Sequence, residues 1–352
     1  MSTRRRLERL RELMRARGVD LVVLSTTSNM YYLTGFVEEQ MERPLLFFVT
    51  EESEFFLAPK MYEGMLPPGF EAVYYLDGEN PFSKLDLRAK VLAVDDQMWS
   101  LHSIPILERV SPERVVMASS LLGELRAVKD EEEVEAIRKA GEIARKAFES
   151  VREKVKEGMS EDEIARFYEE EVRSLGAQVA FETIVGSGPN SALPHHRHSN
   201  RKVRRGDVIV LDFGVRLSGY NVDVTRPLFV GQPEREAIET FEAVLRAQSR
   251  AVAEAREGRV AKELDRAARE ELGDLSEFFT HRLGHGIGLD VHELPYISPD
   301  SDYELRKGNV FTVEPGVYFP GKFGIRIEDT FVLKDKLEPL DSVPKSLDYL
   351  KA

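Results

Sequence analysis

The stretch Val208-Ile-Val-Leu-Asp212-Phe-Gly-Val-Arg-Leu217-Ser-Gly219-Tyr-Asn-Val-Asp223-Val-Thr-Arg226 predicts a β-hairpin that carries two acidic side chains. Both arms are rich in β-branched and aromatic residues, and Ser218-Gly219 supplies the turn between them. With the turn at this point, Asp212 and Asp223 lie opposite or nearly opposite each other. Opposed side chains have Cβ atoms roughly 4.5–5.5 Å apart, so two carboxylates placed there repel unless a cation neutralises them.

A second stretch, Val310 to Val332, repeats the arrangement with glutamates. Glu314 lies in the first arm and Glu328 in the second, and both are equally distant from Gly321 in the turn region between them. This symmetry predicts a second pair of facing carboxylates. Sites rich in carboxylates suit divalent cations such as Mn²⁺, so the two hairpins together predict a metal site.

One imidazole accompanies the carboxylates. His281 and His285 are spaced as in helical zinc motifs, but the glycines on both sides of His285 disfavour the interior of a helix. We therefore expect His285 on an irregular backbone that glycine permits. A single imidazole among carboxylates shifts the expected metal toward Mn²⁺, Co²⁺ or Zn²⁺ and away from Ca²⁺.

The histidines are clustered along the chain. Six of the seven fall into two short segments, namely His195, His196, His198, His281, His285 and His292. Such clustering predicts that the two segments contribute to one shared site.

At these residues the chain resembles the metallopeptidase family of prolidases, aminopeptidases P and methionine aminopeptidases, which share the pita-bread fold. The resemblance implies five metal ligands, which are Asp212, Asp223, His285, Glu314 and Glu328. It extends over nearly the whole chain, because the segment from Ser28 to Phe36 resembles the N-terminal domain of the prolidase and creatinase branch. Methionine aminopeptidases lack that domain.

The resemblance also implies how the site works. Two divalent ions, Mn²⁺ or Co²⁺ with Zn²⁺ or Fe²⁺ as alternatives, would hold a bridging hydroxide that attacks the carbonyl carbon before proline. Glu314 would accept the proton of the attacking water and pass it to the leaving nitrogen. His195 and His292 complete the implied catalytic set.

Four residues of the implied substrate pocket are His195, His281, His292 and Arg326. Alternation along a strand places Arg326 on the same face as Glu328, which disfavours a surface role for this arginine. His196 stands where the family commonly has glycine, so whether His195 or His196 faces the site stays open at this point.

Three functions compete. An Xaa-Pro dipeptidase, or prolidase, is favoured because the chain is compact and has no third domain to recognise longer peptides. Aminopeptidase P, which acts on longer peptides, shares all five implied ligands. A non-peptidase amidohydrolase such as creatinase, or an inactive scaffold, is disfavoured because those proteins typically have other residues at the ligand positions.

Composition excludes several classes of function. The chain has 352 residues and no cysteine, so disulfides and thiolate catalysis are excluded. A net charge of −13 argues against nucleic-acid binding. No apolar segment is long enough to cross a membrane or to form a signal peptide. We expect a cytoplasmic homodimer whose partners are proline-containing dipeptides or short peptides.

The chain divides into two predicted domains with different patterns. Residues 1–122 alternate helix and strand and form a small α/β domain, with a helix over 4–17, strands near 20–25 and 91–94, and a hairpin over 45–57. Residues 123–352 form the α+β pita-bread domain, a curved antiparallel sheet covered by helices. Those helices are predicted at 130–156, from Ser160, at 234–257 and at 261–272.

Overall fold

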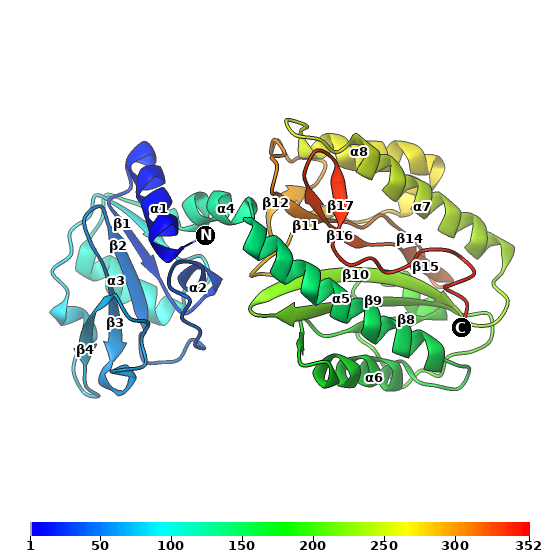
Figure 1. Ribbon diagram of the computed structural model, residues 1–352, viewed down its shortest axis with the longest axis horizontal. Coiled ribbons are helices and arrows are strands. Elements are labelled where there is room, and N and C mark those ends of the chain that lie inside the picture. The colour runs from blue at the N-terminus through cyan, green and yellow to red at the C-terminus, as the bar shows by residue number, and fades with distance from the viewer. Residues whose placement is uncertain (1) are drawn as a thin grey trace. The chain divides into compact units, whose positions relative to one another are not determined.

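The computed structural model describes residues 2–352, which divide along the chain into two compact units, with the division between Arg126 and Ala127 (Figure 1). The boundary that we predicted, between residues 122 and 123, falls inside the helix α4 (Ser119–Ala127). The domain limit between residues 122 and 123 therefore stays a prediction. Within the described residues, no helix is both long and apolar enough to cross a bilayer.

The N-terminal unit is built on a six-stranded mixed sheet with the order β4-β3-β2-β1-β5-β6. Its strands are β1 (Leu21–Leu24), β2 (Leu46–Thr50), β3 (Glu54–Pro59), β4 (Glu71–Tyr75), β5 (Val91–Val94) and β6 (Arg114–Met117). Its helices are α1 (Thr3–Arg17), α2 (Ser28–Thr34) and α3 (Ser100–Val110), with short 3₁₀ turns at Lys60–Tyr62 and Pro81–Lys84. The predicted helix, strands and hairpin of this unit are all present.

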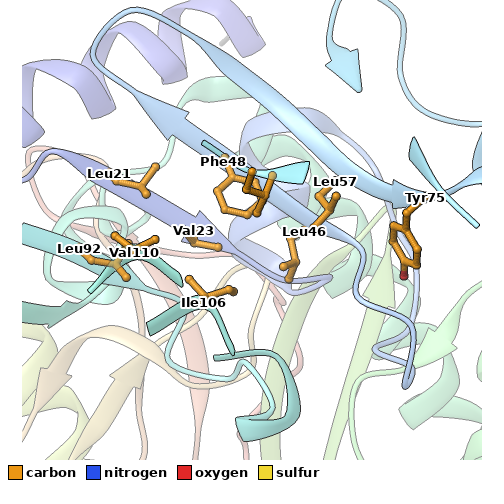
Figure 2. Packing of buried hydrophobic residues seen from close by; sticks show 10 residues of the cluster. Leu21, Val23, Leu46, Phe48, Leu57, Tyr75, Leu92, Ile106 and Val110 are labelled. Carbon is orange, nitrogen blue, oxygen red and sulfur yellow. The ribbon is translucent and has the colours of Figure 1, made fainter. Parts of the chain in front are cut away.

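One face of that sheet forms an apolar core with α3. Val23 and Phe48 project from neighbouring strands toward Ile106 of the helix, and all three are buried (Figure 2). The four residues of β1 are buried on both faces, as expected of a central strand. All residues of this cluster belong to the N-terminal unit.

The C-terminal unit contains antiparallel sheets with four long helices. Its helices are α5 (Glu131–Lys154), α6 (Glu161–Ser174), α7 (Arg235–Glu254) and α8 (Ala261–Leu272), with 3₁₀ turns at Gly188–Ala192 and Gly273–Phe278. Its strands are β7 (Gln178–Val179), β8 (Ile184–Ser187), β9 (Val208–Leu217), β10 (Tyr220–Phe229), β11 (Gly284–Gly286), β12 (Glu293–Ile297), β13 (Val310–Val313), β14 (Gly316–Phe319), β15 (Phe323–Arg326), β16 (Asp329–Leu333) and β17 (Leu337–Pro339).

The helices cover the outer sides of this sheet structure (Figure 1). Helix α5 packs on β9 and β10, α6 packs on β7 and β8, and α7 and α8 pack against each other and on the later strands. Helices α5 and α6 begin where they were predicted, and Asp130 and Ser160 each form a capping box with the glutamate three residues on. The predicted α+β pita-bread architecture is confirmed.

Candidate metal centre and substrate pocket

The two strands of the first hairpin, β9 and β10, pair as predicted, and their register shows that the two aspartates are offset by two residues. Ser218 and Gly219 both adopt positive φ angles, 51° and 84°, which is typical of the two-residue turns that fit the strand twist. Asp223 then pairs with Gly214, and Asp212 pairs with Thr225. The two aspartates are therefore diagonal neighbours on one face of the hairpin. Both are buried, with exposed fractions of 8% for Asp212 and 5% for Asp223.

The second hairpin is interrupted at its glutamates. Strand β13 pairs with β16 and β14 pairs with β15, and both pairs share one register in which Glu314 faces Glu328. The backbone of Glu328 also pairs with Thr225 of the first hairpin, through N–O distances of 3.1 and 3.3 Å. This bridge joins the two hairpins and places their acidic residues in one buried cluster.

His285 reaches the cluster from the three-residue strand β11. Its Nε2 lies 3.8 Å from Oδ2 of Asp223 and 3.4 Å from Oε1 of Glu314. A Cβ on Gly284 would lie 2.0 Å from the carbonyl oxygen of Thr312, and one on Gly286 would lie 2.1 Å from that of Leu294. The prediction of an irregular backbone is wrong at His285 itself, which lies within strand β11. The glycines are required by close strand packing, and the pairing shifts register just after His285.

Burial and mutual repulsion dominate the electrostatics of the carboxylates. Burial, and then the charge of Asp212, raise the pKa of Asp223 well above its usual range. Burial, and then the charge of Asp223, do the same for the pKa of Glu328. Burial also raises the pKa of Glu314 to about 8. Because a divalent cation between these groups would remove both penalties, the cluster has the electrostatics of a cation site.

The imidazole is suited to the same role. Burial, with the neighbouring His292 as the next cause, lowers the pKa of His285 well below its usual range. The ring is therefore neutral, which is the form that binds metals. Its Nδ1 lies 3.1 Å from the carbonyl oxygen of Gly286, so that Nε2 faces the carboxylates.

Three carboxylate oxygens of the cluster have no hydrogen-bond partner anywhere in residues 2–352. They are Oδ1 of Asp212, Oδ1 of Asp223 and Oε1 of Glu328. Ligand atoms of Asp223, His285 and Glu328 all lie within 4.8 Å of one another. Buried polar atoms are normally satisfied, so three free oxygens beside a neutral imidazole fit a metal well.

Arg326 borders the cluster and is buried. Its Nη2 donates to Oδ2 of Asp212 across 2.6 Å, and its Nη1 donates to the hydroxyl of Tyr318 across 2.8 Å. The same hydroxyl lies 2.9 Å from Nε2 of His281, whose Nδ1 is 3.9 Å from Glu314. Burial, and then Arg326, lower the pKa of His281 to about 3. Arg326 and His281, which are two of the four predicted pocket residues, thus both contact the acidic cluster.

A cavity of about 400 Å³ opens onto the aspartates. His195 and His292 line it and are exposed, while Phe181, Ile184 and Val291 give it apolar walls. The His292 ring lies 4.2 Å from the His285 ring, centroid to centroid. The volume lies in the range of small-molecule sites, and the apolar walls suit an apolar substrate side chain.

The sequence left open whether His195 or His196 faces the site, and the structure gives these two side chains different environments. His196 lies along the same cavity, but its Nε2 is 2.9 Å from Oε2 of the fully buried Glu161. His195, by contrast, is exposed and lines the cavity together with His292. The structure therefore ties His196 to Glu161 and leaves the side chain of His195 exposed in the cavity.

Three threonines that the sequence reasoning missed orient the cluster. Thr225 donates to Oε2 of Glu328 across 2.6 Å. Thr330 donates to the carbonyl oxygen of Asp223, and Thr312 accepts from the backbone N–H of His285. Each threonine lies two residues from Asp223, Glu314 or Glu328, so alternation along a strand was the signal that could have identified them.

Comparisons with known proteins agree with this geometry. A family model described as metallopeptidase family M24 matches residues 135–335, and one described as creatinase/prolidase N-terminal domain matches residues 6–128. An Xaa-Pro dipeptidase from Pyrococcus horikoshii is 34% identical over 335 residues, which cover 93% of this chain and 94% of the relative.

Two solved structures extend the comparison. A prolidase from Thermococcus sibiricus superimposes with a TM-score of 0.92 at 38% identity and covers 99% of both chains. An X-Pro aminopeptidase from Thermotoga maritima superimposes with a TM-score of 0.81 at 36% identity, covering 94% of this chain and 97% of the other. The likeness therefore includes both domains and both of the peptidase types considered above.

Proposed function

Because the chain belongs to metallopeptidase family M24, whose members hydrolyse peptides with divalent metals, we propose that it cleaves the bond before proline in Xaa-Pro dipeptides. Support comes from the relatives named Xaa-Pro dipeptidase and prolidase, which match along nearly the full length of both chains. The observation that carries the chemistry is the set of unpartnered, buried carboxylate oxygens beside the cavity.

We propose that five residues hold two divalent ions, Mn²⁺ or Co²⁺, with Zn²⁺ and Fe²⁺ as alternatives. They are Asp212, Asp223, His285, Glu314 and Glu328. Such ions lower the pKa of water and polarise the carbonyl group that is attacked. Carboxylate oxygens with one imidazole nitrogen make a donor set that suits Mn²⁺.

The side chains around this centre would move protons and orient the substrate. Glu314, whose Oε1 lies 3.4 Å from Nε2 of His285, would accept a proton from the attacking water and pass it to the proline nitrogen. His195 and His292 are exposed in the cavity and would bind the substrate carboxylate. Arg326 already pairs with Asp212, so its proposed role is to hold that ligand in place.

Aminopeptidase P activity is the second candidate, favoured by the similarity to the Thermotoga maritima enzyme. The two activities differ in the group that the substrate carries on the C-terminal side of proline. A dipeptide carries a free carboxylate there, and a charge-assisted hydrogen bond to it contributes roughly 1.5–3 kcal/mol. A longer peptide carries a neutral amide at this point and loses that contribution.

The deciding experiment compares three substrates that share the same first residue, Xaa-Pro, Xaa-Pro-amide and Xaa-Pro-Xaa. For a dipeptidase, kcat/KM for Xaa-Pro should exceed the other two by about tenfold or more, which corresponds to ~1.4 kcal/mol in the transition state. Equal or faster cleavage of the tripeptide would assign the protein as an aminopeptidase P.

Three further features, expected from the sequence, are also proposals. We propose that residues 123–352 form the catalytic domain and residues 1–122 the N-terminal domain, that the protein is a homodimer, and that it acts in the cytoplasm. Light scattering coupled to size-exclusion chromatography tests the proposed homodimer, because a dimer has twice the 40.0 kDa mass of one chain.

A further inference from the structure

A buried carboxylate outside the metal cluster organises the loop that carries His195. Glu161, the first residue of α6, is fully buried and accepts hydrogen bonds from four residues of the segment 187–199. Oε1 accepts from the backbone and hydroxyl of Ser187, at 2.8 and 2.7 Å, and from Asn190 at 3.0 Å. Oε2 accepts from Ser199, again through backbone and hydroxyl, and contacts His196.

This network balances the cost of burying a charge. Burial by itself raises the pKa of Glu161, but the hydrogen bonds from Ser199, Ser187 and His196 outweigh it and lower the pKa. The carboxylate is therefore ionised and can only accept, so His196 donates to it from Nε2. A buried charge with this many donors defines the conformation of the loop around it.

The loop is held on both sides of His195. On one side, Pro194 accepts a hydrogen bond from Nη1 of Arg326 across 3.3 Å, and the same arginine binds Asp212. On the other side, His196 is bound to Glu161 at 2.9 Å. Between these two anchors, the His195 side chain is exposed in the cavity beside Asp212 and Asp223.

The geometry points to Glu161, acting through His196, as a positioning residue that fixes His195 over the substrate. This inference rests on the proposed function, in which His195 contacts the substrate. Glu161 lies in no metal cluster of the described chain and does not line the cavity. Its influence on the reaction therefore has to pass through the loop. A displacement of about 1 Å in a positioned group is enough to lower a rate about a hundredfold.

A double-mutant cycle tests the connection. Glu161→Gln keeps the size of the side chain but replaces one acceptor oxygen by an NH₂ group, and we expect kcat/KM for Xaa-Pro to fall about tenfold or more. In a His195→Ala background the same change should cost less than about twofold, because its target is already absent. An equal loss in both backgrounds would mean that Glu161 acts independently of His195 and would overturn the inference.

A milder pair of variants covers the case in which Glu161→Gln does not fold. His196→Ala removes one donor of the network at a partly exposed position, and it should lower kcat about threefold to tenfold, with a smaller change in KM. His196→Gln retains an N–H donor and should restore most of the lost kcat. Equal kcat values in His196→Ala and the parent protein would contradict the role of His196.

The matched control lies one residue further along the same helix. Asp162 contacts Nδ1 of His198 at 2.7 Å, which is an analogous carboxylate–histidine pair in the same loop but outside the two anchors, Pro194 and His196, that flank His195. Asp162→Asn should therefore change kcat/KM by less than about twofold. A loss as large as that of Glu161→Gln would indicate a general effect of loosening the loop and would overturn the specific role of Glu161.

A spectroscopic measurement separates failure of this inference from failure of the proposed function. The imidazole nitrogen signals of His195 can be assigned by NMR from their loss in His195→Ala. They should shift in Glu161→Gln and His196→Ala but not in Asp162→Asn, whatever peptide the enzyme cleaves. Unchanged His195 signals in the first two variants would overturn the inference, even if Xaa-Pro dipeptides prove to be the substrate.

Discussion

Arg326 binds Asp212 through a hydrogen bond of 2.6 Å between Nη2 and Oδ2, and both side chains are buried. The two residues are 114 positions apart in the sequence and belong to different hairpins. The guanidinium group thus brings one positive charge to a cluster of four carboxylates. It leaves Oδ1 of Asp212 free of protein partners within residues 2–352.

Removing this arginine should destabilise the metal-free protein. Arg326→Ala leaves a buried carboxylate without its partner, which typically costs about 3 kcal/mol of unfolding free energy or more. Saturating Mn²⁺ should reduce the loss, because the cation compensates the same charges. Chemical denaturation with and without metal measures both values, and Arg326→Lys, which keeps the charge, is the control. Equal losses in the two conditions would argue against a cation beside Asp212.

Asp223→Asn should lower kcat by roughly a thousandfold or more and reduce the metal content. Asp223 contributes one unpartnered oxygen to the cluster, and a neutral amide cannot balance the charge of a cation there. Steady-state kinetics together with elemental analysis of the purified variant provide the test. If the variant retained its metal and near-normal kcat, Asp223 would not be a ligand.

Chelation should abolish activity without unfolding the protein. The cluster stands on two hairpins joined by the backbone bridge between Thr225 and Glu328, so the fold does not depend on a metal. Circular dichroism should be unchanged after stripping, and Mn²⁺ or Co²⁺ should restore turnover. Free metal at about one hundred times its Kd should raise the unfolding free energy by about 2.7 kcal/mol. Full activity in protein verified as metal-free would exclude a metal mechanism.

Gly284→Ala should destabilise the protein and impair metal binding together. The new Cβ would lie 2.0 Å from the carbonyl oxygen of Thr312, so β11 would have to move and carry His285 with it. Overpacking of this kind costs about 3 kcal/mol or more when backbone atoms clash. Gly321→Ala is the control, since its Cβ would meet nothing within 4 Å and only its φ of 74° is unfavourable. Similar thermal stability of the two variants would refute the packing explanation.

Local patterns determined much of this protein from its sequence. The Ser218-Gly219 turn and the alternation of side chains placed both aspartates on one face, and the symmetry about Gly321 placed Glu314 opposite Glu328. The acidic turn that follows Asp130 and the capping pattern at Ser160 located two helix starts. Helix α3 escaped prediction because it contains Pro105 and has no side-chain cap. The features that were predicted, namely the turn, the alternation and the two helix starts, depend on interactions between residues close in sequence, which a pattern can reveal.

Only the tertiary structure decided which distant groups meet. The pairing of Arg326 with Asp212, of Thr225 with Glu328, and of Glu161 with His196 depends on how separate strands, helices and loops pack. No periodicity records such contacts, because the segments involved are distant in sequence and share no turn or helix that would set their register. The residue types of the proposed metal site could therefore be predicted from the sequence. Their orientation, the unpartnered oxygens and the hydrogen bonds around the loop of His195 come from packing.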